Sequence, residues 1–230
     1  MKKCKKKVLH AGVLMMALFA IWTFLIQTVD VQPAGQNGTD IGFSALNLWF
    51  HKLTGVHMKL YIATDWLGLV PILCCLIFGM LGAIQLIRRK SLCKVDRDLL
   101  LLGIYYILVI FGYLIFEMIP INYRPILIEG NMEASYPSST TLLVFSVMPT
   151  VSFQAHYRIK HTGIRTIIKA FVVLFSLFMG IGRTIAGVHW LTDIVGSVLF
   201  SAGLYLIYQS AVLFWDQKQE DQWRQYYGIE

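Results

Sequence analysis

Long apolar runs, each long enough to cross a lipid bilayer as a helix, dominate this sequence of 230 residues. A helix rises about 1.5 Å per residue and the hydrocarbon core is about 30 Å thick, so about 20 apolar residues span it. Six stretches reach this length, at 8–28, 66–87, 98–119, 138–156, 166–187 and 190–213. The fourth is the least apolar, because it opens with Ser138-Ser139-Thr140-Thr141. The sequence therefore predicts an all-α, polytopic membrane protein with six transmembrane helices.

The composition supports a membrane protein and argues against a nucleic-acid-binding one. Apolar residues make up 57% of the chain and charged residues 14%, whereas soluble domains are about 45–50% apolar and about 25% charged. The net charge of +7 could suggest a nucleic-acid partner. However, the basic residues lie in short clusters between the apolar runs, which is the pattern of a membrane protein.

These basic clusters also predict how the chain is oriented. With the N-terminus inside and the helices alternating, 16 of the 20 Lys and Arg residues fall on the cytoplasmic side, as the positive-inside rule requires. The other four fall outside or at the outer membrane face: Lys52, Lys59, Arg124 and Arg183. We therefore predict a multi-pass protein with both termini in the cytoplasm. The basic loops and compact size fit a cell membrane, and a eukaryotic internal membrane is the alternative.

The N-terminal segment has the basic start of a signal peptide but not its length. The apolar run that follows Met1–Lys7 extends to about Thr28 and ends without a small-x-small cleavage site, which predicts an uncleaved signal anchor. We expect three parts: residues 1–65, with the anchor helix and an outer amphipathic loop; a helical core, 66–214; and a cytoplasmic tail, 215–230. In the loop, Ile41–Leu53 has apolar residues at helical spacing. It could lie along the membrane interface or cap the other helices.

Ionisable residues inside or at the ends of membrane helices are costly and usually functional. Five of them reach the outer face in the predicted topology: Glu117, Arg124, Arg183, His189 and Asp193.

Several residues at the outer face have the chemistry of a phosphate site. The N-terminus of the fourth span would present unpaired N–H groups and a partial positive charge to an anion. Ser138, Ser139 and Thr140 would add hydroxyl donors there. Arg124 and Arg183 supply forked donors that match a phosphate group. We expect these five residues to bind phosphate without a metal ion or other cofactor.

His189 and Asp193 add a possible nucleophile to this site. They are four residues apart and so share one helix face. The carboxylate could keep one ring nitrogen protonated and free the other for covalent attack. Each feature also has a structural alternative, since Arg183 could snorkel to the interface and Ser138 could be an ordinary N-cap.

At these residues the chain resembles the type 2 phosphatidic acid phosphatase family, which are membrane lipid phosphatases related to vanadium haloperoxidases. The family pattern is KxxxxxxRP, then PSGH, then SRxxxxxHxxxD. The corresponding segments here are Glu117 to Pro125, Pro137 to Thr140 and Gly182 to Asp193. The order and spacing match, and the resemblance covers about residues 60–213.

The resemblance implies a haloperoxidase-like bundle formed by the last four helices and a lipid phosphate or diphosphate as substrate. It also implies that Arg124 and Arg183 hold the phosphate, that His189 attacks phosphorus, and that Asp193 orients His189. The reaction would be hydrolysis at the outer face, or transfer of the phosphoryl group to another acceptor.

Two departures from the family pattern bear on the mechanism. Glu117 stands where the family has lysine, and it could pair with Arg124 two helical turns later. Thr140 stands where the family has the histidine that protonates the leaving oxygen, and losing a general acid typically costs about 10²–10⁴ in rate. A diphosphate leaves as a weakly basic phosphate, so the sequence predicts a preference for lipid diphosphates such as a polyprenyl diphosphate. His51 or His57 could supply the missing acid instead.

Two rival functions remain open at this level. Because two motifs are altered, the protein could be a non-catalytic lipid-phosphate binder, for example in transport, and would then tolerate loss of His189. A purely structural membrane subunit would tolerate loss of Arg124 and Arg183 as well.

Overall fold

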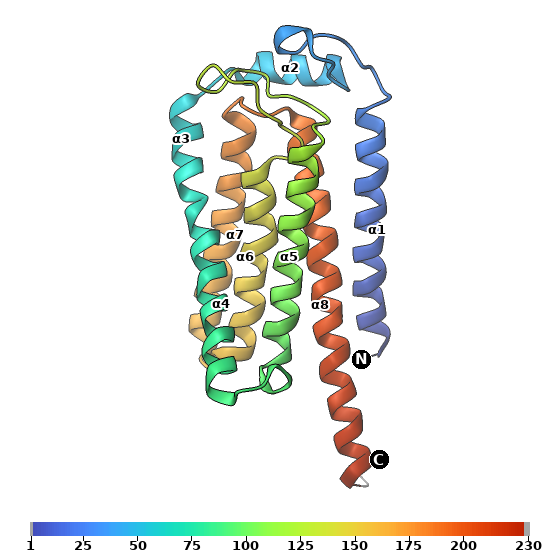
Figure 1. The fold of residues 1–230 in the computed structure, drawn as a ribbon, viewed down its shortest axis with the longest axis vertical. Helices are drawn as coiled ribbons and strands as arrows, with labels where there is room; N and C mark the ends of the chain where they lie inside the picture. Colours follow the sequence, from blue (N-terminus) through green and yellow to red (C-terminus); the bar gives the residue numbers. More distant parts are fainter. Residues whose placement is uncertain (1, 228–230) are drawn as a thin grey trace.

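The apolar runs form helices that stand side by side in the computed structural model, which describes residues 2–227. Figure 1 shows the long helices aligned in one bundle. The helices are α1 (Lys2–Ile26), α2 (Ser44–Thr54), α3 (Met58–Leu67), α4 (Leu69–Arg89), α5 (Arg97–Met118), α6 (Ser139–Arg158), α7 (Thr162–Ile185) and α8 (Leu191–Tyr227), with short 3₁₀ turns η1 (Gln36–Gly38) and η2 (Leu92–Lys94). The predicted all-α fold is confirmed.

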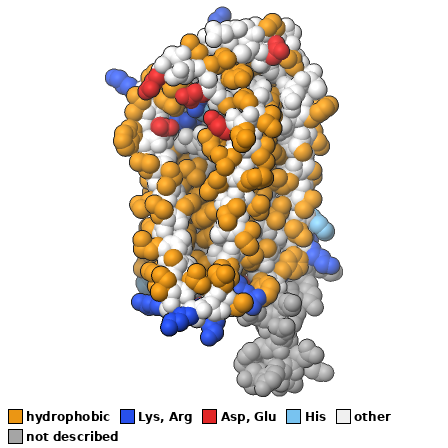
Figure 2. Space-filling model, in the orientation of Figure 1, with side chains coloured by type: hydrophobic (Ala, Val, Ile, Leu, Met, Phe, Trp, Pro, Cys, Tyr) orange, Lys and Arg blue, Asp and Glu red, His pale blue; other side chains and the backbone are white. Residues whose placement is uncertain are grey.

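Five helical segments in the described chain are long and apolar enough to cross a membrane. They are Lys5–Ile26, Met58–Arg89, Arg97–Met118, Thr162–Ile185 and Leu191–Asp216. Apolar side chains cover the sides of the bundle, and basic side chains gather at the end that holds the α4–α5 connection (Figure 2). An apolar flank with charged ends is the surface expected of a polytopic membrane protein.

The predicted fourth span, 138–156, corresponds to α6, which is not among these five segments and is more polar than they are. Its polar side chains Ser146, Thr150 and Gln154 are fully buried. Two of them bond to tyrosines of neighbouring helices, at 2.7 Å between the Thr150 and Tyr106 hydroxyls and 2.7 Å from Gln154 Nε2 to the Tyr208 hydroxyl. With 20 residues it is about 30 Å long. Since its polar groups are satisfied within the protein, α6 can lie at membrane depth without being apolar.

The helix α2 lies across one end of the bundle (Figure 1) and contains most of the segment Ile41–Leu53 that showed helical spacing in the sequence. Its Asn47 is fully buried, and its Nδ2 donates to the carbonyl of Gly42 at 2.8 Å and to the hydroxyl of Thr192 at 3.0 Å. On its other face, Trp49 and Leu53 are 58% and 68% exposed. The helix is therefore a cap over the bundle that still offers an apolar face to its surroundings.

The two chain ends lie at the end of the bundle opposite α2 (Figure 1). α1 packs along α8. The predicted boundary at residue 65 falls inside the helical segment Met58–Arg89, and the predicted tail, 215–230, begins within α8, which continues to Tyr227. The α4–α5 and α6–α7 connections lie at the same end of the bundle as the chain ends (Figure 1). The basic clusters Arg88–Lys94 and Arg158–Lys169 lie in these connections and in the adjoining helix turns.

Candidate active site

A polar cavity of about 200 Å³ lies at the α2 end of the bundle. It is enclosed by the last turns of α5, the connection from α5 to α6, the start of α6 and the loop between α7 and α8. Its lining residues are Tyr113, Phe116, Glu117, Arg124, Glu133, Ala134, Tyr136, Pro137, Ser139 and His189. Segments far apart in the sequence therefore meet here, and we call this space the phosphate pocket because of the groups described below.

The short loop between α7 and α8 carries His189 into the pocket. Gly187 in this loop has φ +71°, and a β-carbon there would lie 2.0 Å from the carbonyl oxygen of Gly55, so only glycine fits without strain. The loop is also tied to the cap, because the His57 amide donates to the Ala186 carbonyl at 3.0 Å. The ring of His51 contacts the Gly187 carbonyl at 3.1 Å through Nε2. These contacts fix the backbone that carries His189.

The histidines considered above as substitute acids are both used in the cap. His51 bonds to the Gly187 carbonyl, and Nε2 of His57 lies 2.9 Å from the carbonyl of Thr54. Neither side chain lines the phosphate pocket. Their positions therefore favour a structural role in the cap.

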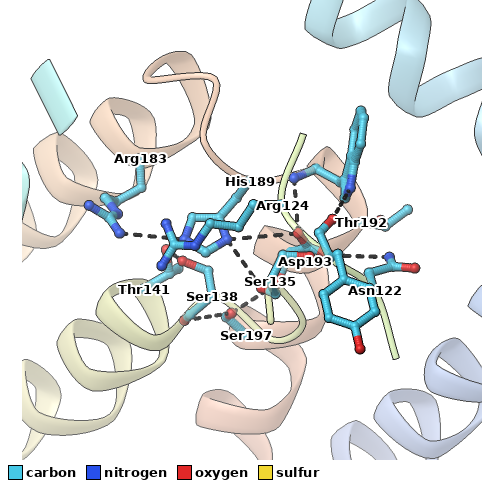
Figure 3. Close-up of polar contacts among 12 residues, drawn as sticks. Asn122, Arg124, Ser135, Ser138, Thr141, Arg183, His189, Thr192, Asp193 and Ser197 are labelled. Atoms are coloured by element: carbon cyan, nitrogen blue, oxygen red, sulfur yellow. Dashed lines mark hydrogen bonds and ion pairs between the residues drawn. The ribbon is translucent and has the colours of Figure 1, made fainter. Parts of the chain in front are cut away.

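The contacts of His189 fix its tautomer. Its Nδ1 lies 3.1 Å from the carbonyl oxygen of Ser135. A carbonyl only accepts hydrogen bonds, so Nδ1 carries the proton and Nε2 carries the lone pair. Nε2 accepts a long hydrogen bond of 3.4 Å from Nη2 of Arg183, because a guanidinium only donates. Figure 3 shows the ring held between Arg183 and Asp193, with Arg124 beside it.

Asp193 lies near His189, but the structure gives it different partners from those the sequence suggests. Its Oδ2 is 3.8 Å from Nδ1 of His189, within ion-pair range but beyond a hydrogen bond. Oδ2 instead accepts from the backbone N–H of Trp190 at 2.9 Å, and Oδ1 from Asn122 Nδ2 at 3.4 Å. The Ser135 carbonyl thus takes the orienting bond predicted for Asp193, and Asp193 holds the start of α8 in place.

The surroundings of His189 keep its ring neutral. Burial lowers the pKa of His189 well below its usual value of 6.5, and the positive charges of Arg124 and Arg183 lower it further. The hydrogen bond to the Ser135 carbonyl acts in the opposite direction. A neutral imidazole with an unprotonated Nε2 is the nucleophilic form.

Both predicted arginines lie beside His189 and are almost fully buried. Arg124 is 8% exposed, and its Nε lies 3.0 Å from Oε2 of Glu133, so it pairs with this residue. Arg183 is 1% exposed and lies 3.6 Å from Asp65 through Nη1. Within residues 2–227, Nη1 of Arg124 and Nε of Arg183 are buried without a hydrogen-bond acceptor. Buried charged donors without an acceptor are unfavourable, and an anion such as phosphate would satisfy them.

The start of α6 also faces this site, although its three predicted donors differ in position. Ser139 lines the pocket. Ser138 is fully buried, and its hydroxyl is 3.0 Å from that of Thr141. Thr140 lines a different cavity, described next. The helix end therefore offers its N–H groups and one hydroxyl to an anion, and Thr140 does not line the pocket.

A second, mainly apolar groove of about 320 Å³ adjoins the phosphate pocket. It lies between α4, α5 and α6, and we call it the lipid groove. Its lining residues are Asp65, Gly68, Leu69, Ile72, Val109, Ile110, Tyr113, Ser139, Thr140, Leu142 and Leu143. Tyr113 and Ser139 line both cavities, so they mark the junction between them.

Sequence reasoning missed Ser135, Glu133 and Asn122 as site residues. Ser135 acts through its backbone carbonyl, which residue type does not reveal. Glu133 lies in the α5–α6 connection, outside any motif. Asn122 directly precedes Tyr123 and Arg124, and its closeness to a buried arginine was the one available signal.

Within the described residues, no group of three or more His, Cys, Asp or Glu side chains is arranged to hold a metal ion. The fold and the site together define an integral membrane protein with a buried histidine between two arginines. A family model described as the PAP2 superfamily matches residues 99–217. The chain belongs to this superfamily, which confirms the predicted family.

One solved structure is similar over nearly the whole chain. It is the crystal structure of the first transmembrane PAP2 type phosphatidylglycerolphosphate phosphatase from Bacillus subtilis, with a TM-score of 0.60 and 19% sequence identity. The match covers 91% of this chain and 97% of that one. A search of curated proteins found no match. The similarity supports the fold of the bundle.

Proposed function

We propose that this protein hydrolyses lipid phosphate or diphosphate esters at the outer face of the cell membrane, through a phosphohistidine on His189. The observation that carries the proposal is the state of His189, whose Nδ1 is bonded to the Ser135 carbonyl while Nε2 faces Arg183. The unpaired donors of Arg124 and Arg183 lie next to it. A phosphate bound to both arginines would have its phosphorus within reach of Nε2.

The reaction has two steps. The Nε2 lone pair attacks the terminal phosphorus, and the bond from this phosphorus to the leaving oxygen breaks, with its electron pair staying on that oxygen. The leaving oxygen is the lipid alcohol's oxygen in a monophosphate and the bridging oxygen, which leaves on the inner phosphate, in a diphosphate. Water then attacks the phosphohistidine, the P–N bond breaks, and inorganic phosphate leaves. The arginines and the α6 N–H groups stabilise the negative charge on the phosphoryl oxygens in both steps.

The two cavities support a substrate with an anionic head and an apolar chain. The head would bind in the phosphate pocket, and the chain would lie along Leu69, Ile110 and Leu143 of the lipid groove. The basic connections lie at the opposite end of the bundle, so the positive-inside rule supports an outward-facing pocket. A phosphatidylglycerolphosphate phosphatase is the similar structure, which supports a phospholipid as one substrate class.

Phosphate release from phosphatidic acid and from a polyprenyl diphosphate, in matched micelles without added metal, tests the proposal. The wild type should release phosphate from at least one lipid, and His189→Ala should abolish it. His10→Ala, which changes an exposed histidine of α1, is the matched control and should keep full activity. If the wild type binds the lipids but releases no more phosphate than His189→Ala, the protein is a lipid-phosphate binder instead.

A further inference from the structure

The position that supplies the proton donor in the family pattern is Thr140 here, and its side chain lines the lipid groove instead of the phosphate pocket. A lipid alkoxide needs a proton as it leaves. If the proposed reaction is right, this proton must come from another group in the phosphate pocket.

The titratable residues that line the phosphate pocket are Tyr113, Glu117, Arg124, Glu133, Tyr136 and His189. Each of them can be compared as a proton donor.

Most of these residues are already committed to another role. His189 is the proposed nucleophile, and Arg124 would hold the phosphate. Glu133 is paired with Arg124, whose Nε lies 3.0 Å from Oε2 of Glu133. The hydroxyl of Tyr136 bonds to Thr23 of α1 at 2.7 Å, and burial raises its pKa.

Tyr113 and Glu117 remain. They are four residues apart on α5, so they share one face of that helix. Both side chains line the phosphate pocket. Tyr113 lines both the phosphate pocket and the lipid groove. The oxygen that joins the phosphate to the lipid chain would lie at this same junction.

We propose that Glu117 is the general acid, in the place of the missing histidine. As the bond from Nε2 of His189 to phosphorus forms, the bond from phosphorus to the lipid oxygen breaks and that oxygen takes the proton of Glu117. The Glu117 carboxylate then accepts a proton from the water that attacks the phosphohistidine. The inference rests on the proposed hydrolysis.

The ionisable groups that line the pocket together with Glu117 are Tyr113 on α5, Arg124, Glu133 and Tyr136 on the α5–α6 connection, and His189 on the α7–α8 loop. Among them, Arg124 is paired with Glu133.

The test is Glu117→Gln, assayed on two lipids with different leaving groups. Turnover of phosphatidic acid, whose leaving group is a basic alkoxide, should fall by about 10²–10⁴. Turnover of a polyprenyl diphosphate, whose leaving group is a weakly basic phosphate, should fall by less than about tenfold, because it needs little protonation.

A control variant completes the test. Glu129→Gln changes an exposed glutamate of the α5–α6 connection and should leave both activities unchanged. Equal losses on both lipids, or unchanged phosphatidic acid turnover in Glu117→Gln, would overturn the role of Glu117. A wild type without His189-dependent release would instead overturn the proposed function.

Discussion

Replacing Arg183 by lysine isolates what the forked guanidinium contributes to phosphate binding. Arg183 lies in the last turn of α7 and is 1% exposed, and its guanidinium carbon lies 4.9 Å from the centre of the Tyr61 ring. Its Nη2 contacts His189 at 3.4 Å, and its Nε has no acceptor within residues 2–227. Lysine keeps the positive charge but loses the planar pair of donors.

The size of the effect follows from the hydrogen bond that is lost. A hydrogen bond to a charged group contributes about 1.5–3 kcal/mol, and about 1.4 kcal/mol corresponds to a factor of ten in rate. Losing one donor to the phosphoryl oxygens should therefore lower kcat/KM by about ten- to 150-fold. Alanine would be a poorer test, because it would also leave a cavity beside Asp65 and could destabilise the fold.

The assay is kcat/KM for phosphate release from a lipid diphosphate, with thermal unfolding measured on the same preparations. Arg165→Lys, at the opposite end of the bundle, is the matched control. We expect the Arg183 variant to unfold within a few degrees of the wild type while its kcat/KM falls. A variant with wild-type kcat/KM would refute the reasoning, since Arg183 could then make no fork with the phosphate.

Three further predictions concern the loop, the pKa of His189 and the lipid groove. Neutral His189 is the proposed active form and its pKa is lowered, so its titration should limit kcat/KM only well below pH 6.5. Arg183→Gln removes a nearby positive charge, so it should raise the pKa of His189 and move this acid limb to higher pH. Paired pH–rate profiles of the wild type and the variant on one substrate would show the shift. Gly187→Ala should lower both the unfolding temperature and kcat, because its φ is +71° and its β-carbon would meet a backbone carbonyl at 2.0 Å. Ile110→Trp should raise KM for long-chain lipids but not for a short-chain analogue, since it fills the lipid groove, whereas Leu108→Trp on the same helix should change neither.

The helices could be predicted from the sequence because the bilayer imposes one length on all of them. The predicted fourth span, 138–156, compares with an observed α6 of Ser139–Arg158, although hydropathy ranks it last. The reason for its polarity needed the structure: Thr150 and Gln154 bond to tyrosines of other helices. A sequence shows that such residues are polar, but not that they have partners inside the bundle.

The site was less predictable, because several of its contacts come from backbone atoms. The spacing of Arg183 and His189 brings the two side chains into contact at 3.4 Å. The His189 tautomer is fixed by the Ser135 carbonyl, and Asp193 is held by the Trp190 N–H. Such backbone contacts cannot be inferred from residue types. The ion pair between Arg124 and Glu133 also depends on how the α5–α6 connection folds back.

Those backbone contacts also explain how two motif positions can differ from the family pattern while the nucleophile keeps its geometry. His189 is held by the Ser135 carbonyl, and its loop by Gly187 and the cap, none of which involves position 117 or 140. Thr140 lines the lipid groove. Glu117 lies on α5 and not on the α7–α8 loop that carries His189. In the proposed reaction, we therefore expect changes at these two positions to act on protonation of the leaving group more than on attack at phosphorus. Under this proposal the proton donor can lie on either helix, because the leaving oxygen would lie at a junction that both α5 and α6 border.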